Sequence, residues 1–379
     1  MTQIAFLIDR FEYETAGTER QLLLLARAVI QRGFDLRIVS LRDASRLRDL
    51  LPVVEIQELG IGSLRDFRSM AIAVRTVGRL RRDGVRLVHC WFNDSSMLWP
   101  PLARSLGISV VVSRRDLGFW YSRAKLQWLR MIRRAVDIVV ANSDAVRLAV
   151  LEHERFAAGQ VRVIPNGVWE PATGNHRADS TGAATVLSPG RWIVAVANLR
   201  PLKRLDLLVR ALAEIESRHP DVKIAIVGAD KSDSGQSCVG QLRQLGRDLG
   251  VGEKVVFAGS QADPRPFLEQ ATICVLASDT EGLSNSLIEY ALAGRPIVCS
   301  DIAANREIVS DRESGLLFLP GSASELASAL ETLLANPALA ASLAARAKIE
   351  AQERFSVETM VRRHCELYRE LIDAADRRR

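Results

Sequence analysis

Short apolar runs alternate with longer amphipathic stretches throughout the first half of the chain. Each run has strand length and precedes a stretch of helical periodicity, which predicts strands joined by helices. The clearest helix is predicted over 18–32, just before Gly33, and Leu22, Leu25 and Val29 share its apolar face. The strands predicted in this half are 4–9, 36–41, 87–91, 110–114, 138–142 and 161–165. Strands that alternate with helices form parallel sheets, so we expect a Rossmann-like α/β domain here.

This alternation stops in a stretch rich in Gly, Ser, Thr and Pro, residues 169–191, which is typical of a linker. A second alternating series follows, and it predicts a second Rossmann-like domain. Its predicted strands are 193–197, 223–228, 255–258, 273–277 and 297–300. We therefore expect domains over 1–170 and 191–356 with a linker over 171–190, and helical structure near the end of the chain.

Composition and length agree with a two-domain globular protein. The chain has 379 residues, 48% of them hydrophobic and 25% charged. No apolar run approaches the roughly 18 residues that a membrane span needs, and the first residues resemble a strand rather than a signal peptide. The five cysteines are scattered without any CxxC pair, so we expect free thiols and no zinc site.

Positive charge is concentrated in one region. Between positions 64 and 134 there are 15 Lys and Arg against 4 Asp and Glu, whereas the net charge of the whole chain is only +6. Such a region favours an anionic partner, namely a phosphate, a nucleic acid or a membrane surface, although a solvated basic face is the plain alternative.

The stretch 273–307 carries the clearest candidate chemistry. The sequence predicts a strand, a polar loop over 278–286, a helix from Leu287, and a further strand. Glu281 lies in the loop and Glu289 in the helix. Backbone amides at Asn285 and Ser286 would face a phosphate at the helix N-terminus, and Glu289 would accept hydrogen bonds from a sugar diol. Alternatively, Ser286 and Glu289 form an ordinary capping box.

The run EGLSNSLIE, followed by ALAGRPIV, resembles the two-glutamate motif of retaining glycosyltransferases of family 4. This resemblance implies the GT-B fold, in which two Rossmann-like domains face a central cleft. It further implies that Glu281 lies near the transferred sugar and that Glu289 binds the nucleotide ribose, with Ser284, Asn285 and Ser286 also on the donor side. In this fold the last helix, about 357–379 here, packs back on the first domain.

Two further loops match the family in part. Gly17, at the start of the first predicted helix, matches one of the two glycines that the family usually has, and a plain N-cap by Thr18 is the alternative. After the linker, Lys203 matches the family's lysine, while Asn198 stands where an arginine is expected. We expect Arg200 and Lys203 to bind the donor diphosphate, and exposed loop charges are the alternative.

The acceptor side is predicted from two strand ends. His89 ends one strand, and Arg115 and Asp116 follow the next. Relatives often carry a histidine where Arg115 stands, so Asp116 is the nearest carboxylate that could orient the sugar or the acceptor. A structural role for His89 is the alternative. We therefore name Glu281 and Asp116 as catalytic candidates, His89 and Arg115 as acceptor-side candidates, and no general base.

These observations lead us to expect a retaining glycosyltransferase that uses a nucleotide-diphosphate sugar and a glycan or lipid-linked acceptor. We expect no metal and no other cofactor, because helix N-termini, Arg200 and Lys203 would stabilise the diphosphate. The expected location is the cytoplasm. The alternatives are a nucleotide-sugar epimerase or phosphorylase on the same fold, a nucleic-acid-binding protein, which lacks stacking motifs here, and an NAD-dependent oxidoreductase, which lacks GxGxxG.

The segment 119–137, FWYSRAKLQWLRMIRRAVD, further suggests work at an anionic membrane surface. Read as one helix, it places Tyr121, Ala124, Trp128, Ile132 and Ala135 on a single stripe. Basic residues surround this stripe, namely Arg123, Lys125, Arg130, Arg133 and Arg134. The alternative is that the stripe packs against the sheet, as a Rossmann helix normally does.

Overall fold

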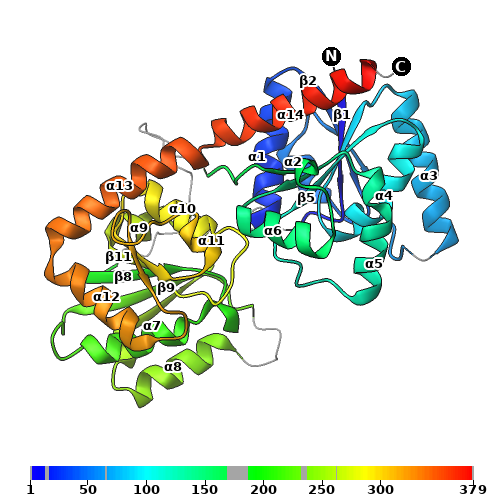
Figure 1. Ribbon diagram of the computed structural model, residues 1–379. Helices are drawn as coiled ribbons and strands as arrows, with labels where there is room; N and C mark the ends of the chain where they lie inside the picture. Colours follow the sequence, from blue (N-terminus) through cyan, green and yellow to red (C-terminus); the bar gives the residue numbers. More distant parts are fainter. Residues whose placement is uncertain are drawn as a thin grey trace. The chain divides into compact units, whose positions relative to one another are not determined.

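Two parallel sheets, each covered by helices, make up the protein (Figure 1). The structure is a computed structural model and describes residues 2–12, 17–64, 66–168, 187–231, 237–261 and 263–377. The chain divides into two compact units, Met1–Gly167 with Val357–Arg379 as unit 1 and Val168–Ser356 as unit 2. Most of the predicted linker, residues 171–186, lies outside the described residues.

Unit 1 contains a seven-stranded sheet in the order β3-β2-β1-β4-β5-β6-β7, and every neighbouring pair is parallel. Its strands are β1 (Thr2–Ile8), β2 (Phe34–Ser40), β3 (Glu55–Glu58), β4 (Leu87–Cys90), β5 (Ser109–Arg114), β6 (Ile138–Ala141) and β7 (Val161–Val163). Its helices are α1 (Gly17–Gln31), α2 (Ser45–Leu50), α3 (Phe67–Arg82), α4 (Asn93–Ser105), α5 (Arg123–Ile132), α6 (Asp144–His153) and α14 (Val357–Arg377).

Both faces of this sheet are buried, which is the usual state of a parallel sheet. Successive side chains of a strand point to opposite faces, so Ile4 and Phe6 of β1 join one core while Ala5 and Leu7 join the other. The C-terminal helix α14 covers part of the first core, to which it contributes Tyr368, and it lies along α1 (Figure 1). The last helix of the chain is therefore part of unit 1.

Unit 2 contains a six-stranded parallel sheet in the order β10-β9-β8-β11-β12-β13. Its strands are β8 (Arg191–Val196), β9 (Val222–Val227), β10 (Val255–Gly259), β11 (Ala271–Leu276), β12 (Ile297–Ser300) and β13 (Leu316–Phe318). Its helices are α7 (Leu205–Ile215), α8 (Cys238–Asp248), α9 (Arg265–Gln270), α10 (Asn285–Leu292), α11 (Ala303–Arg306), α12 (Ala323–Ala335) and α13 (Pro337–Phe355).

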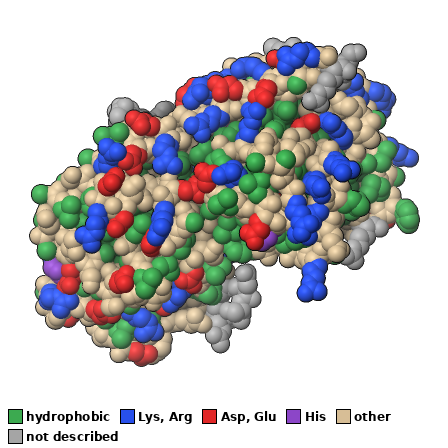
Figure 2. Space-filling model, in the orientation of Figure 1, with side chains coloured by type: hydrophobic (Ala, Val, Ile, Leu, Met, Phe, Trp, Pro, Cys, Tyr) green, Lys and Arg blue, Asp and Glu red, His purple; other side chains and the backbone are tan. Residues whose placement is uncertain are grey.

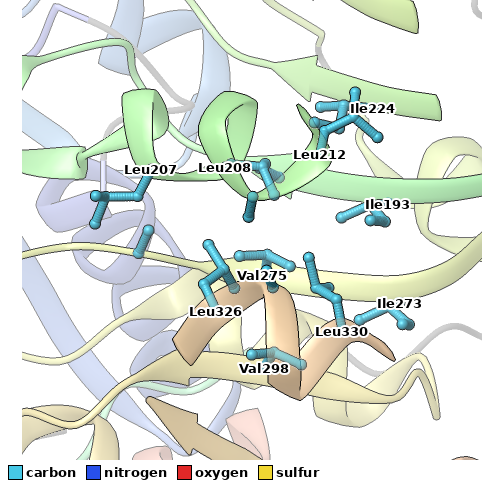
Figure 3. Close-up of a cluster of buried hydrophobic side chains, with 14 of the residues drawn as sticks. Ile193, Leu207, Leu208, Leu212, Ile224, Ile273, Val275, Val298, Leu326 and Leu330 are labelled. Carbon is cyan, nitrogen blue, oxygen red and sulfur yellow. The ribbon is translucent and has the colours of Figure 1, made fainter. Parts of the chain in front are cut away.

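The core of unit 2 lies between its sheet and the helices α7 and α12. Figure 3 shows Leu208 and Leu212 of α7 and Leu330 of α12 among the branched side chains of the strands, such as Ile193 and Val275. All five side chains are almost completely buried. This packing holds the sheet rigid, and with it the loops at the carboxyl ends of its strands.

The predicted fold class, two parallel α/β units, is confirmed. Two edge strands, β3 and β13, were not predicted. β3 has the sequence EIQE, with no fully buried residue, and β13 has only three residues, so neither gives an apolar pattern long enough to predict a strand. Within the described part of the chain, no single helix is long and apolar enough for a membrane span, and only α12 with α13, bent by 103° at their junction, would meet that test as a pair.

The expectation of one helix over 119–137 is wrong. α5 begins at Arg123 after the N-cap Ser122, and a short 3-10 turn over Arg133–Ala135 follows it. Leu129 and Ile132 are the buried side chains of α5, whereas Ala124 is exposed. The proposed stripe therefore does not exist as predicted: of its five residues only Ile132 is buried, while Tyr121 precedes the helix and Ala135 lies in the 3-10 turn.

Candidate functional site

The strand order in unit 2 reverses between β8 and β11. β8 leads through α7 to its neighbour on one side, whereas β11 leads through α10 to its neighbour on the other side. The loops after two such strands diverge and leave a crevice outside their carboxyl ends, where open α/β sheets bind ligands. Lys203 follows β8 and Glu281 follows β11, so the fold brings these two predicted residues to the switch point.

The loop after β8 is tied to the loop after β11 by backbone and side-chain contacts. The Asp279 amide donates to the Leu202 carbonyl at 2.9 Å. Pro201–Lys203 forms a 3-10 turn that ends at Arg204 in the left-handed conformation, with φ of 46°. The Arg204 side chain then pairs with Asp206 and with Asp279, which lies in the other loop. Lys203 is therefore placed by a short, braced turn.

Lys203 and Glu281 form an ion pair across these loops. Lys203 Nζ lies 2.5 Å from Glu281 Oε1, and the Ser278 hydroxyl donates to the same oxygen at 2.6 Å. The Glu281 side chain is 12% exposed and that of Lys203 25%. The Ser278 carbonyl in turn accepts a hydrogen bond from the Ser300 hydroxyl at 2.6 Å. The carboxylate is thus held in place by side chains and backbone from three strand ends.

Helix α10 begins at Asn285, two residues earlier than predicted, and Ser284 is its N-cap. The Ser284 hydroxyl accepts a hydrogen bond from the Leu287 amide at 3.3 Å. The capping box of Ser286 with Glu289 is therefore wrong, because Ser286 lies inside the helix and its hydroxyl donates to the Val196 carbonyl at 2.7 Å. Glu289 lies in the second turn, partly buried.

Tyr290 connects α10 to the end of β8. The Val196 amide donates to its hydroxyl oxygen at 2.7 Å, and burial raises the pKa of Tyr290 well above its usual value. Ser286 and Tyr290 therefore both hold the first turns of α10 against the end of β8. The helix N-terminus, with its partial positive charge and its first-turn amides, lies at the same switch point as Lys203.

Arg200, the second predicted phosphate ligand, is exposed and lines a hollow of about 530 Å³ between its own loop, α7 and α8. Neither Lys203 nor Glu281 lines that hollow. The structure thus brings Lys203, Glu281 and the start of α10 together but places Arg200 at the margin of the group. Its role in binding a phosphate stays a prediction.

In unit 1, Gly17 is the first residue of α1 and is exposed, and residues 13–16 before it lie outside the described residues. Asp9, at the end of β1, was not singled out in the sequence. Its carboxylate accepts hydrogen bonds from the amides of Asp94 and Ser95, at 2.9 and 2.7 Å, and so holds the start of α4. Burial raises the pKa of Asp9.

His89 lies inside unit 1 with no exposed surface. Its Nδ1 lies 2.6 Å from the Tyr368 hydroxyl and its Nε2 lies 2.9 Å from the Ser113 hydroxyl. Burial lowers its pKa well below the usual value, and the neighbouring His364 and Arg115 lower it further. A neutral, fully bonded imidazole agrees with the structural alternative, and it leaves no exposed ring atom for an acceptor.

Arg115 and Asp116 follow β5. The Arg115 guanidinium lies over the Trp91 ring, 4.5 Å from its centroid, and Nη1 donates to Asn166 Oδ1 at 2.5 Å. The Asp116 carboxylate accepts a hydrogen bond from the Gly118 amide at 2.7 Å and is partly exposed. Asp116 therefore shapes its own turn, and a role toward substrate stays a prediction.

A buried ion pair beside these residues was missed in the sequence. Arg114 donates from Nε and Nη2 to the two oxygens of Glu154, at 2.7 and 2.9 Å, and the Tyr121 hydroxyl also donates to Glu154. Burial alone would lower the pKa of Arg114, but the charge and hydrogen bonds of Glu154 raise it above the usual value. No sequence signal links positions 40 residues apart.

The arrangement in unit 2 suits an anionic ligand with a polar body. Lys203 and the start of α10 can stabilise negative charge, while Glu281 and Glu289 can accept hydrogen bonds from hydroxyl groups. Among the residues that the structure describes, no group of three or more His, Cys, Asp or Glu side chains is placed to hold a metal ion. The chemistry that follows from these residues is electrostatic stabilisation of a phosphate.

Comparisons with known proteins agree on one family. Residues 190–336 match the model of glycosyl transferases group 1, and residues 15–169 match the model of glycosyltransferase family 4. Among relatives, the lipopolysaccharide core biosynthesis glycosyltransferase LpsE of Rhizobium meliloti (strain 1021) is 26% identical over 93% of this chain and 95% of its own length. The D-inositol 3-phosphate glycosyltransferase of Acidothermus cellulolyticus is 27% identical over 96% and 87%.

Solved structures show the same fold. The HepE protein of Anabaena, in complex with UDP, superposes with a TM-score of 0.81 at 21% identity, over 98% of this chain and 100% of that one. A glycosyltransferase from Rickettsia africae reaches a TM-score of 0.84 at 18% identity, over 98% and 99%. With two family domains matched in succession and this fold, the chain belongs to glycosyltransferase family 4 and is a glycosyltransferase of the GT-B type.

Proposed function

We propose that the protein is a retaining, metal-independent glycosyltransferase that moves a sugar from a nucleotide-diphosphate sugar to a glycan or lipid-linked acceptor in polysaccharide or cell-envelope synthesis. The observation that carries this proposal is the ion pair of Lys203 with Glu281. The two residues are 78 positions apart, and they meet at the switch point of unit 2, beside the start of α10.

The donor is held by separate parts of this group. Lys203 contacts the diphosphate together with the first-turn amides of α10, and Arg200 adds positive charge from the margin. Glu289 accepts hydrogen bonds from the ribose, and Glu281 lies at the transferred sugar. The Anabaena HepE structures contain UDP and UDP-glucose, which supports a nucleotide-sugar donor for a chain of the same fold.

The reaction proceeds by departure of the diphosphate, whose charge Lys203 and the helix N-terminus stabilise. Retention requires the acceptor hydroxyl to attack from the face that the diphosphate leaves. Glu281 is already braced by Ser278 and Lys203, so it can position sugar hydroxyls without reorganising. The names of LpsE and of the inositol phosphate glycosyltransferase support glycan or phosphorylated acceptors.

A panel of nucleotide sugars tests the donor. UDP-, GDP- and ADP-linked hexoses are added to the protein and its unfolding is followed. A true donor at 100 times its dissociation constant should add about 2.7 kcal/mol to the free energy of unfolding, while the matching free sugar should add nothing. If no member of the panel stabilises the protein, the proposed function is wrong. Turnover without acceptor would favour an epimerase.

We further propose that unit 1 works at an anionic membrane surface. Around α5, Phe119, Trp128 and Met131 are 65%, 41% and 64% exposed, and the exposed Arg123 and Arg134 lie in the same segment. Basic side chains also gather over the α4–α6 side of unit 1 (Figure 2). Exposed aromatic and basic residues together suit the headgroup region of a bilayer.

Cosedimentation with liposomes tests this surface. The protein should bind vesicles that contain anionic lipid, bind less as salt rises, and bind less when Arg123 and Arg134 are changed to Gln. Exchange of the exposed Arg210, in unit 2, to Gln is the control and should change nothing. Protein that remains in the supernatant with anionic vesicles at low salt would favour a water-soluble acceptor instead.

A further inference from the structure

Two adjacent arginines at the end of β5 have opposite surroundings. Arg114 is 5% exposed and its charge is matched by the bidentate carboxylate of Glu154. For Arg115, no carboxylate forms an ion pair among the residues that the structure describes. A guanidinium removed from water is costly unless a negative charge compensates it. Arg114 therefore has a compensating carboxylate, and Arg115 has no equivalent among the described residues.

Neutral groups surround Arg115. One face of its guanidinium lies on the Trp91 ring, and its Nη1 donates to the neutral side chain of Asn166. His89 and His364, whose pKa values burial lowers, are close enough for the Arg115 charge to depress them further. Burial lowers the pKa of Arg115 itself to about 10, although the Tyr368 hydroxyl acts in the opposite direction.

Several polar atoms in this cluster are buried without a hydrogen-bond partner. They include two donors, Arg115 Nε and Trp91 Nε1, as well as Asn142 Oδ1. Asn142 touches the same loop, because its Nδ2 donates to the Arg115 carbonyl at 3.4 Å. Buried donors that lack acceptors are rare in folded proteins, so this cluster is short of acceptor oxygens.

These side chains share one edge of the unit 1 sheet, and Arg115 is the one that is partly accessible. Trp91, Arg115 and Asn142 each follow the last residue of a strand, namely β4, β5 and β6, so they share the carboxyl edge of the unit 1 sheet. Open parallel sheets bind ligands at this edge, and it is next to the β1/β4 switch point. Arg115 remains partly accessible, although its Nε is fully covered.

We propose that Arg115 binds an anionic group of a substrate, a carboxylate or a phosphate, through the accessible part of its guanidinium group. This inference rests on the proposed transferase function, because only then is the bound anion a substrate. It adds that the donor or the acceptor carries a negatively charged group that contacts Arg115. A planar guanidinium suits both groups, because each offers two oxygens at a matching spacing.

The direct test observes Arg115 itself in the intact protein. With arginine labelled by ¹⁵N, the Nε–Hε resonance of Arg115 is assigned from its loss in Arg115→Lys. Addition of glucuronate or of glucose 6-phosphate should shift this resonance in a saturable way, whereas glucose should not. The Nε–Hε resonance of Arg134, assigned through Arg134→Gln, is the control and should not move. Absence of a saturable shift with either anion, or an equal shift with glucose, overturns the proposal.

Further titrations identify which substrate carries the charge. A larger shift of the Arg115 resonance with UDP-glucuronate than with UDP-glucose indicates an anion on the transferred sugar. A shift with UDP alone indicates the donor diphosphate, and a shift only with the two free anionic sugars indicates an acceptor. In Arg115→Gln the affinity for the active anion should fall about tenfold or more, as for a lost charge-assisted hydrogen bond, with the neutral analogue unchanged. These titrations measure binding without turnover. Loss of anion binding with transfer intact would therefore contradict the role of Arg115 alone, whereas absence of transfer with anion binding intact would contradict the proposed function alone.

Discussion

Among single residues, Glu281 and Glu289 have different surroundings, so their substitution should affect different steps of the reaction. Glu281 is fixed by Lys203 and Ser278 on one oxygen, Oε1, within the loop after β11. Glu289 lies one turn into α10, beyond the amides that would face the diphosphate. The first position suits contact with a reacting sugar, and the second suits a more remote hydroxyl pair such as the ribose.

Isosteric exchange separates these roles. Glu281→Gln should lower kcat by about 100-fold while the donor dissociation constant changes little, because its contact matters most in the transition state. Glu289→Gln should instead weaken donor binding about tenfold. Steady-state kinetics together with calorimetry measure both quantities. Glu331→Gln, on α12, is the control, and wild-type kinetics in both site variants would refute the assignment.

The buried pair of Arg114 with Glu154 should dominate the stability of its region. Removal of the carboxylate leaves a buried guanidinium unpaired, so Glu154→Ala should lower the free energy of unfolding by about 3–5 kcal/mol. The exposed pair of Arg162 with Glu370 is also bidentate, through Nη1 and Nη2. Glu370→Ala should therefore cost at most about 1 kcal/mol, and equal losses in urea unfolding would show that burial is not the cause.

Candidate site residues could be singled out from the sequence only where a local pattern marked them. Glu281, Glu289 and Lys203 lie in runs with recognisable spacing, and the structure brings Lys203 to Glu281. Glu154 has no such pattern, because its partner Arg114 comes from another element and the pair exists only after folding. The lack of a counter-charge at Arg115 could not be predicted from the sequence either, because it depends on all the side chains that surround Arg115 in the folded protein.

At the scale of elements, α10 shows why a helix start is hard to predict. The stretch SNS offers two serines, and the apolar periodicity favoured Ser286 as the start. In the structure Ser284 caps the helix, because the hydroxyl of Ser286 is used by the Val196 carbonyl of β8. A tertiary contact therefore decides between two locally equivalent caps. The edge strands β3 and β13 escaped prediction for a related reason, since only their neighbours make them strands.

Removal of the cap tests the place of α10 in the site. Ser284→Ala should lower the free energy of unfolding by about 1 kcal/mol and should also weaken donor binding, because the first turn of α10 loosens. Ser322 caps α12 in the same way, through a bond from the Glu325 amide at 3.2 Å. Ser322→Ala should cost similar stability and leave donor affinity unchanged. Equal donor affinity in both variants would place the ligand away from α10.

At the scale of the whole molecule, one topology is used twice. In each unit the sheet order reverses beside the first strand, between β1 and β4 in unit 1 and between β8 and β11 in unit 2. The alternation of apolar runs and helical stretches predicted both sheets, because parallel strands buried on both faces give strong patterns. Polar residues at the strand ends were then predictable as a group, while their individual contacts were not.

Unit 1 should lose stability in mild acid. His89 and His364 are buried and neutral, and burial lowers the pKa of His364 to about 3. The unfolded chain protonates each at its ordinary pKa near 6.5, so it binds more protons than the folded chain below that pH. The contribution of His364 to the free energy of unfolding is fully present above about pH 6.5 and is lost between pH 6.5 and 3, by up to about 1.4 kcal/mol per pH unit. The contribution of His89 falls in the same direction. Urea unfolding of the wild type and of His364→Met should show a smaller slope in the variant, and identical slopes would contradict this origin.

Lys203, at the switch point of unit 2, should bind the diphosphate of a nucleotide-sugar donor. Calorimetric titration of nucleoside diphosphates and of the matching nucleosides into wild type, Lys203→Ala and the control Lys223→Ala tests it most directly. We expect Lys203→Ala to weaken binding of the diphosphate by about 2 kcal/mol, roughly 30-fold, and to leave binding of the nucleoside unchanged, while Lys223→Ala should bind both as the wild type does. Equal losses for diphosphate and nucleoside, or unchanged diphosphate affinity in Lys203→Ala, would contradict it.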